Sequence, residues 1–213
     1  MPEPRVTGLE PDPRRPGALR VALDGRAWGA VPLEAAERLR LAAGTRLDEA
    51  TLAALGAAAD EEAAFRAALR HLERRGFATR DLARRLGRRG HGPDAVGAAT
   101  RRLHALGLLD DAAFARQYVE SRAARGRGPA RLRRDLLALG VADTVADAAL
   151  AAHWPEGADL AGATRRLAER RARQLGTLPR PVLRRRLLAY LARRGYAGRD
   201  VGRIVAEVLG ERA

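Results

Sequence analysis

The chain has 213 residues and a net charge of +14, and all 40 of its Lys and Arg residues are arginine. Because lysine and cysteine are absent, a Walker-type phosphate loop, a Schiff base, a thiolate metal site and a disulfide are excluded. The single serine, Ser121, lacks the GxSxG surroundings of a hydrolase nucleophile. No apolar run approaches the roughly 20 residues that cross a bilayer, and the first residues lack the apolar stretch of a signal peptide. We therefore expect a soluble, cytoplasmic protein that is not an enzyme and binds no cofactor.

A β-hairpin is predicted near the N-terminus. Residues 18–23 alternate apolar and polar side chains and run into Asp24 and Gly25, a strong signal for a two-residue turn between antiparallel strands. The simplest register gives three facing pairs on one side of the hairpin: Leu23 with Arg26, Val21 with Trp28, and Leu19 with Ala30.

Short helices are predicted beside this hairpin. Residues 6–10 can add a third short strand, and after the hairpin the pattern becomes helical. Residues 33–41 and 48–55 favour two short helices separated by Gly44. Residues 1–59 therefore predict a minimal sheet covered by helices.

A Leu-x3-Leu-x3-Gly pattern recurs in the rest of the chain, at separations of 50 and 55 residues. Two leucines one turn apart lie on one face of a helix, and a glycine four residues later suits a left-handed C-terminal cap. We call these the anchor motifs: Leu82, Leu86 and Gly90; Leu132, Leu136 and Gly140; and Leu187, Leu191 and Gly195.

Each anchor motif is expected in the middle of a three-helix bundle. In the first bundle, the acidic residues 60–62 would occupy the first turn of a leading helix, which buries Phe65. Its third helix would begin at Pro93 and end before Gly107. Asp110 would cap the first helix of the second bundle.

The predicted fold class is therefore mainly α. A small N-terminal sheet with helices is followed by three tandem three-helix bundles in an elongated, curved array, because bundles of about 50 residues need neighbours to share burial. The predicted domains are residues 1–59, 60–109, 110–158 and 159–213.

Positive charge is distributed unevenly along the chain. Residues 1–59 have no net charge, 60–109 carry +5, 110–159 carry −1 and 160–213 carry +10. Such fields favour a polyanion or an acidic protein surface; the alternative for any one cluster is a solvated face. The candidate binding residues are Arg84, Arg85, Arg88, Arg89, Arg122, Arg125, Arg127, Arg131, Arg165, Arg166, Arg170, Arg171, Arg184 and Arg185.

The aromatic residues favour phosphate contact over base stacking. Six of them fall at apolar helical positions and are expected in the core: Phe65, Phe77, Phe114, Tyr118, Tyr190 and Tyr196. Phe114, Tyr118 and Arg122 follow at four-residue steps. Packing, with Arg122 stacked on Tyr118 or paired with an acid, is favoured, and a recognition surface for the filament is the alternative.

The remaining polar residues predict no metal or catalytic site. The four histidines lack HExxH spacing. Asp110 and Asp111 precede an apolar-periodic segment, where a helix cap is favoured over a catalytic pair. The segment from Gly126 to Pro129 predicts a turn between helices.

A longer run of residues carries a specific resemblance. It comprises Gly107, Leu108, Leu109, Asp110, Asp111, Phe114, Ala115, Tyr118, Val119, Ser121, Arg122, Gly126, Gly128, Pro129, Leu132, Arg133, Leu136 and Gly140. This run resembles the signature of the RecX family, whose members regulate the bacterial recombinase RecA. The hairpin ending in Asp24 and Gly25, residues 68–72 and residues 82–86 are also similar to the family, and the third bundle matches it more loosely.

The resemblance implies a regulator, of the inhibitor type, of recombination, repair and the SOS response. Such a protein binds in the groove of the RecA filament on single-stranded DNA, bridges protomers and lowers ATP hydrolysis, strand exchange and coprotease activity. Family members also bind DNA directly. The expected partners are therefore the RecA filament and DNA phosphates, with no membrane, and a bridging monomer is the simplest state.

Two features depart from the family pattern. His91 stands where the sister bundles have the apolar Val141 and Tyr196, and arginine replaces lysine throughout. The first departure makes the packing of the first bundle an open question. The alternative function is a stand-alone nucleic-acid-binding module of the helix-turn-helix kind.

Overall fold

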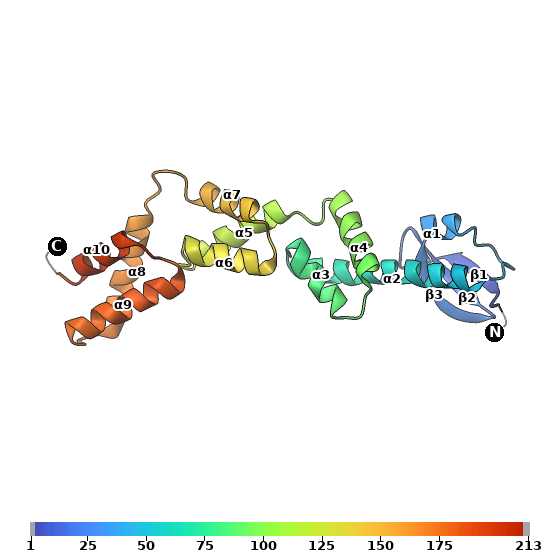
Figure 1. Cartoon of the computed structure of the whole chain (residues 1–213), viewed down its shortest axis with the longest axis horizontal. Coiled ribbons are helices and arrows are strands. Elements are labelled where there is room, and N and C mark those ends of the chain that lie inside the picture. Colours follow the sequence, from blue (N-terminus) through green and yellow to red (C-terminus); the bar gives the residue numbers. More distant parts are fainter. Residues whose placement is uncertain (1–2, 211–213) are drawn as a thin grey trace. The chain divides into compact units, whose positions relative to one another are not determined.

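A computed structural model describes residues 3–210 (Figure 1). The predicted fold class, mainly helical with a small N-terminal sheet, is confirmed. The chain divides into two compact units, Met1–Asp110 and Asp111–Ala213. Residues 1–2 and 211–213 lie outside the described residues. They belong to the first and the last of the predicted domains.

The sheet has three antiparallel strands in the order β1-β2-β3: β1 (Val6–Pro11), β2 (Ala18–Leu23) and β3 (Arg26–Pro32). Asp24 and Gly25 between β2 and β3 have φ angles of 48° and 78°. Two consecutive positive φ angles are the geometry of a type I′ turn. The hairpin and the third strand are therefore confirmed.

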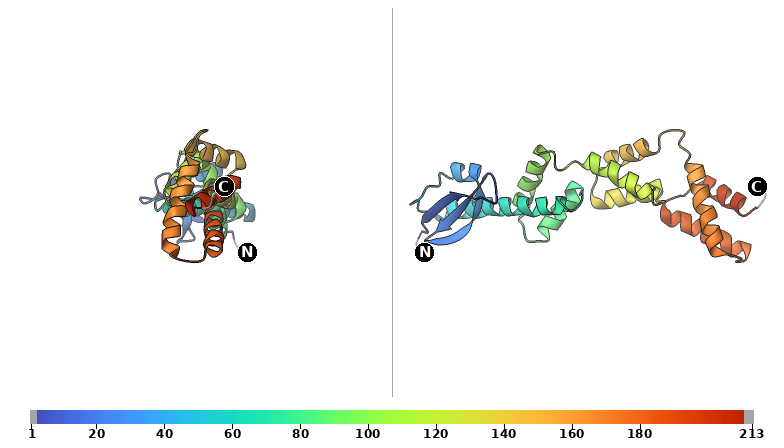
Figure 2. Two further views of the ribbon diagram at one scale, coloured as in Figure 1. Left: turned by 90° about the vertical axis from the view of Figure 1, so that its left-hand side faces the viewer. Right: turned by 180° about the vertical axis from the view of Figure 1, so that it is seen from behind.

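One long helix joins the sheet to the first bundle (Figures 1 and 2). After the short helix α1 (Leu33–Arg38), α2 (Glu49–Leu72) begins at the N-cap Asp48, whose Oδ1 accepts a hydrogen bond from the Thr51 N–H at 2.8 Å. Hydrogen bonding with Thr51 also holds the pKa of Asp48 below its ordinary value.

The prediction of two separate helices here, one ending at residue 55 and the next opening at residue 60, is wrong. The intervening segment is rich in alanine, the best helix former, and its one glycine, Gly56, is tolerated in a helix interior. The predicted boundary between residues 59 and 60 therefore falls inside α2, and the acidic residues 60–62 lie in the middle of the helix, not in its first turn.

The two halves of α2 bury different cores. Its N-terminal half contributes Leu55 and Ala58 to the core beneath the sheet. Its C-terminal half contributes Phe65 and Ala68 to a second core. That core is shared with α3 (Thr79–Gly87) and α4 (Pro93–Ala105), the second of which begins at the predicted proline.

The predicted hairpin register is wrong beyond its first pair. Leu23 lies opposite Arg26, but a β-bulge follows, so that Val21 lies opposite Gly29 and the third pair shifts with it. The bulge makes Trp28 the extra residue of β3, and its side chain is 37% exposed. A Cβ on Gly29 would make an ordinary van der Waals contact with the Ala59 Cβ of α2, at 3.9 Å.

The second unit contains two further bundles. The first is formed by α5 (Asp111–Ala123), α6 (Pro129–Leu139) and α7 (Asp143–His153), and the second by α8 (Leu160–Leu175), α9 (Arg180–Arg194) and α10 (Arg199–Val208).

The anchor motifs have the predicted burial and backbone conformation, and two of their three glycines are helix C-caps. All six of their leucines are 0% exposed. The three glycines, Gly90, Gly140 and Gly195, have φ angles of 93°, 90° and 92°. Gly140 and Gly195 are the left-handed C-caps of α6 and α9, but α3 already ends at Gly87, and Gly90 lies three residues beyond its end.

Glycine backbone connects the two bundles of the second unit. The Gly128 N–H donates to the Arg194 carbonyl at 2.7 Å. A Cβ on Gly128 would lie 2.7 Å from the Gly195 carbonyl oxygen, and one on Gly195 would collide with the Arg131 backbone nitrogen. The segment from Gly126 to Pro129 is thus the predicted turn, and it also packs directly on the end of α9.

Candidate nucleic-acid interface

The candidate arginines of α3 divide into two kinds. Arg84 and Arg85 reach the carboxylate of Asp81, at 3.6 Å and 3.1 Å. Asp81 is only 6% exposed, so this pairing offsets the cost of burying its charge. Arg88 and Arg89 follow the end of the helix and are exposed.

The second group lies on and beside α6. Arg127 and Arg131 both pair with Asp135, at 2.8 Å and 2.9 Å. Arg125 is exposed in the turn before α6. In this group, Arg127 and Arg131 therefore form ion pairs within the fold, and Arg125 takes part in neither of them.

The Phe114, Tyr118 and Arg122 stripe supports the packing hypothesis. The Arg122 guanidinium lies 5.1 Å from the Tyr118 ring centroid, and the Phe114 and Tyr118 centroids are 5.8 Å apart. Both rings are half-buried, as is Tyr190. The expectation that all six aromatic residues are core is therefore only partly correct: Phe65, Phe77 and Tyr196 are buried.

The third group lies on α8 and α9. Arg165 pairs with Glu207 of α10, and Arg166 lies 3.5 Å from Asp159. The hydrogen bond from Arg165 holds the pKa of Glu207 below its ordinary value.

Other candidate arginines of this group are solvent-facing or line a pocket. Arg184 and Arg185 are exposed on α9. Arg170 is exposed on α8, and Arg171 is half-buried.

A pocket within the second unit gathers arginines from both of its bundles. It has a volume of about 280 Å³, and we call it the arginine pocket; it is lined by Ala124, Arg125, Gly126, Leu167, Arg170, Arg171, Gln174, Tyr190 and Arg194. None of these residues is acidic. The pocket therefore joins three candidates that lie up to 46 positions apart in the sequence from one another.

Sequence reasoning missed Arg194. Its Nη1 donates to the carbonyl oxygens of Arg125 and Gly126, at 2.8 Å and 3.2 Å. The available signal was its position directly before the anchor glycine Gly195, where the first bundle has Arg89.

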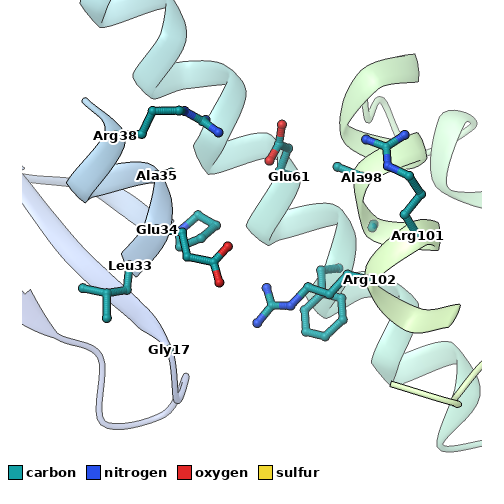
Figure 3. Close-up of a pocket in the computed structure, with 12 residues that line it drawn as sticks. Gly17, Leu33, Glu34, Ala35, Arg38, Glu61, Ala98, Arg101 and Arg102 are labelled. Atoms are coloured by element: carbon teal, nitrogen blue, oxygen red, sulfur yellow. The ribbon is translucent and has the colours of Figure 1, made fainter. Parts of the chain in front are cut away.

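A larger cleft in the first unit has mixed charge (Figure 3). It has a volume of about 410 Å³ and lies between α1, α2 and α4, which contribute Glu34, Glu61 and Arg102 among other residues. The Arg102 guanidinium lies 3.9 Å from the Phe65 ring centroid and donates to the buried Glu62 at 3.1 Å. Because acids and arginines alternate around it, this cleft does not favour a polyanion.

The packing question at His91 has a clear answer. The His91 Nδ1 lies 2.6 Å from Asp60 Oδ1, and the Gly92 N–H donates to Asp60 Oδ2 at 2.8 Å. Burial raises the pKa of Asp60, but the hydrogen bonds from His91 and Gly92 outweigh it and hold that pKa below its ordinary value of 3.8. A polar contact to α2 thus takes the place of apolar packing.

Two kinds of feature are absent from residues 3–210: a cluster of metal ligands and a membrane-spanning helix. Within that range, no three histidine or acidic side chains gather as ligands of a metal ion would. No helix in the same range combines the length and apolarity needed to span a bilayer. The repeated three-helix bundles and the excess of arginine define a basic, modular α-helical protein.

Comparison with known proteins identifies the family. Residues 110–150 match the model of the second three-helix domain of RecX. Regulatory protein RecX of Xanthomonas oryzae pv. oryzae (strain MAFF 311018) is 37% identical over 144 residues, which cover 66% of this chain and 86% of that protein. That of Mycobacterium avium (strain 104) is 40% identical over 159 residues, covering 71% and 88%. The chain belongs to the RecX family.

Other comparisons define the extent of the match. Regulatory protein RecX of Halorhodospira halophila (strain DSM 244 / SL1) is 47% identical over 94 residues, which cover 44% of this chain and only 58% of that relative. A crystal structure of regulatory protein RecX has a TM-score of 0.74 at 24% identity and covers 96% of this chain and 99% of its own. That of RecX from Lactobacillus salivarius has a TM-score of 0.59 at 19% identity, covering 70% and 96%. These two likenesses concern the fold.

Proposed function

We propose that this protein regulates the recombinase RecA as an inhibitor, by binding in the groove of the RecA filament on single-stranded DNA. Membership of a family whose relatives are named regulatory proteins supports the regulatory role. The observation that carries the binding mode is the arginine pocket, where four arginines meet without an acidic neighbour in the lining. Such a surface attracts polyanions by long-range electrostatics.

The proposal covers several further properties. The protein acts as a monomer in the cytoplasm, has no catalytic activity of its own, and modulates ATP hydrolysis, strand exchange and coprotease activity in recombination, repair and the SOS response. Its modules supply several weak contacts, which together give tight binding to a repeating polymer. The division into four domains is part of this proposal, with α2 shared between the first two.

The test is a titration of the full-length protein into a RecA ATPase reaction on single-stranded DNA. We expect inhibition at well below one molecule per RecA protomer, because one bound regulator affects neighbouring protomers. The competing function, a stand-alone helix-turn-helix-like module, is favoured instead if ATP hydrolysis is unaffected while the protein binds duplex DNA tightly.

A further inference from the structure

The arginine pocket concentrates positive charge that the described residues do not neutralise. Within residues 3–210, no carboxylate lies within ion-pair distance of Arg125, Arg170, Arg171 or Arg194. By contrast, Arg165, which lies on α8 but outside the pocket, is paired with Glu207. Like charges held close together repel one another, so the arrangement favours an anion.

The pocket also holds its cations in place. Arg194 is fixed by two backbone carbonyls, of Arg125 and Gly126. The Nη1 of Arg171 donates to Gln174 Oε1 at 3.1 Å. The Nε of Arg171, however, is buried and meets no acceptor in the part of the chain that the structure describes. A buried N–H without an acceptor is costly, and an anion in the pocket can supply one.

The chemistry of the lining favours phosphate over a nucleic-acid base. The guanidinium groups of Arg171 and Arg194 lie 5.4 Å and 4.8 Å from the Tyr190 ring centroid, so the one aromatic ring of the pocket already packs against cations. Planar guanidinium groups match the paired oxygens of a phosphate. Contact with phosphate carries no base information.

We propose that the arginine pocket binds one phosphodiester group of a nucleic-acid strand, without regard to base sequence. The inference rests on the proposed function and names the chemical group recognised by one part of that surface. Arg194 and Arg171 provide the fixed walls, and the exposed Arg125 and Arg170 contribute charge at the pocket without an evident role in the fold.

The test compares two double variants of the full-length protein. R125A with R170A removes two charges from the pocket. R14A with R26A removes two charges from exposed positions of residues 1–59, which have no net charge and do not line the pocket. Affinity for a fluorescent oligo-dT strand is measured over a range of salt concentrations. We expect the pocket variant to lower the slope of log K against log salt by about 0.7, as the removal of one phosphate contact on a single strand requires, and the control to keep the wild-type slope.

A second readout uses inorganic phosphate as the probe. The Nε–H resonance of Arg171 in NMR spectra should shift saturably as phosphate is added to the wild type and the control, but not to the pocket variant. Equal reductions of slope in both variants, or no phosphate-dependent shift in the wild type, would overturn the inference.

The outcomes separate this inference from the proposed function. If the pocket variant keeps the oligo-dT slope but no longer inhibits RecA, the pocket binds an acidic protein segment and the phosphodiester assignment is wrong. If the wild type binds phosphate in the pocket yet leaves RecA ATPase unchanged, the proposed function fails and the phosphodiester site stands.

Discussion

Asp60 links two segments that are 31 positions apart in the sequence. Its two carboxylate oxygens accept from the His91 ring and from the Gly92 N–H, so they hold the loop after α3 against the middle of α2. A polar contact of this kind substitutes for the apolar residue found in the sister bundles. The residue is therefore structural, and its effect should depend on pH.

We predict that Asp60→Asn lowers the free energy of unfolding by about 1 kcal/mol at neutral pH, because it weakens two hydrogen bonds. The folded-state pKa lies below the ordinary value of 3.8, so the ionised carboxylate stabilises the fold fully above that value. The difference between wild type and variant should shrink as the pH falls through the lower, folded-state pKa. Urea unfolding over a range of pH measures it.

Asp94→Asn, at an exposed acid in the first turn of α4, is the control for this effect. If the wild type stays more stable than Asp60→Asn by the same free energy of unfolding in strong acid, the prediction is wrong. The protonated and ionised carboxyl groups would then stabilise the fold equally.

At the scale of elements, the anchor glycines differ in their surroundings although their backbone geometry is nearly the same. Gly90 and Gly195 have φ angles of 93° and 92°. A Cβ on Gly90 would meet nothing within 4 Å, whereas one on Gly195 would collide with the backbone of Arg131. A substitution at Gly90 therefore tests backbone strain alone, and one at Gly195 tests strain together with close packing.

We predict that Gly90→Ala costs about 1 kcal/mol of unfolding free energy, the strain of a left-handed alanine. Gly195→Ala should cost about 1 to 3 kcal/mol more, because it also forces the two bundles of the second unit apart. Chemical denaturation of the two variants measures the difference. Equal destabilisation at both positions would show that the close contact of Gly195, at the end of α9, with Arg131 of α6 contributes nothing to stability.

The elements that could be predicted from the sequence are those specified by local patterns. The leucine and glycine spacing defined the middle helices, and Asp24 with Gly25 defined the hairpin turn. The bulge at Trp28 could not be predicted, because the alternation of apolar and polar residues does not show where an extra residue enters a strand. The continuity of α2 was missed because acidic residues suggested a helix start, while their partners lay elsewhere in the chain.

The candidate site shows the same division. The pairing of Arg85 with Asp81 is an i, i+4 contact that spacing alone allows. The pairing of Arg165 with Glu207 spans 42 positions. The clustering of arginines along the sequence therefore could not show which of them form ion pairs and which are free to bind an anion. The arginine pocket likewise depends on the way Arg194 folds back onto the turn at Gly126.

For the molecule as a whole, the uneven charge has a measurable consequence. Residues 1–59 have no net charge and residues 160–213 carry +10. Exposed arginines of the two regions therefore sit in different electrostatic surroundings, and only those in the strongly basic region are expected to attract DNA.

We predict that R185Q with R186Q, on α9, weakens binding to single-stranded DNA and lowers its salt dependence. The slope should fall by about 0.7 for each phosphate that the variant no longer neutralises. R14Q with R26Q removes the same charge from exposed positions in the neutral region and should leave affinity unchanged. Fluorescence anisotropy at several salt concentrations tests this, and equal weakening by both pairs would mean that net charge alone decides binding.

The continuous α2 helix has a thermodynamic consequence. Because Leu55 and Phe65 lie on the same helix but in different cores, unwinding one end removes the support on which the other end depends. We therefore expect the sheet and the first bundle to melt as a single cooperative unit, although they have separate cores. A helix-breaking change near their junction would be transmitted in both directions.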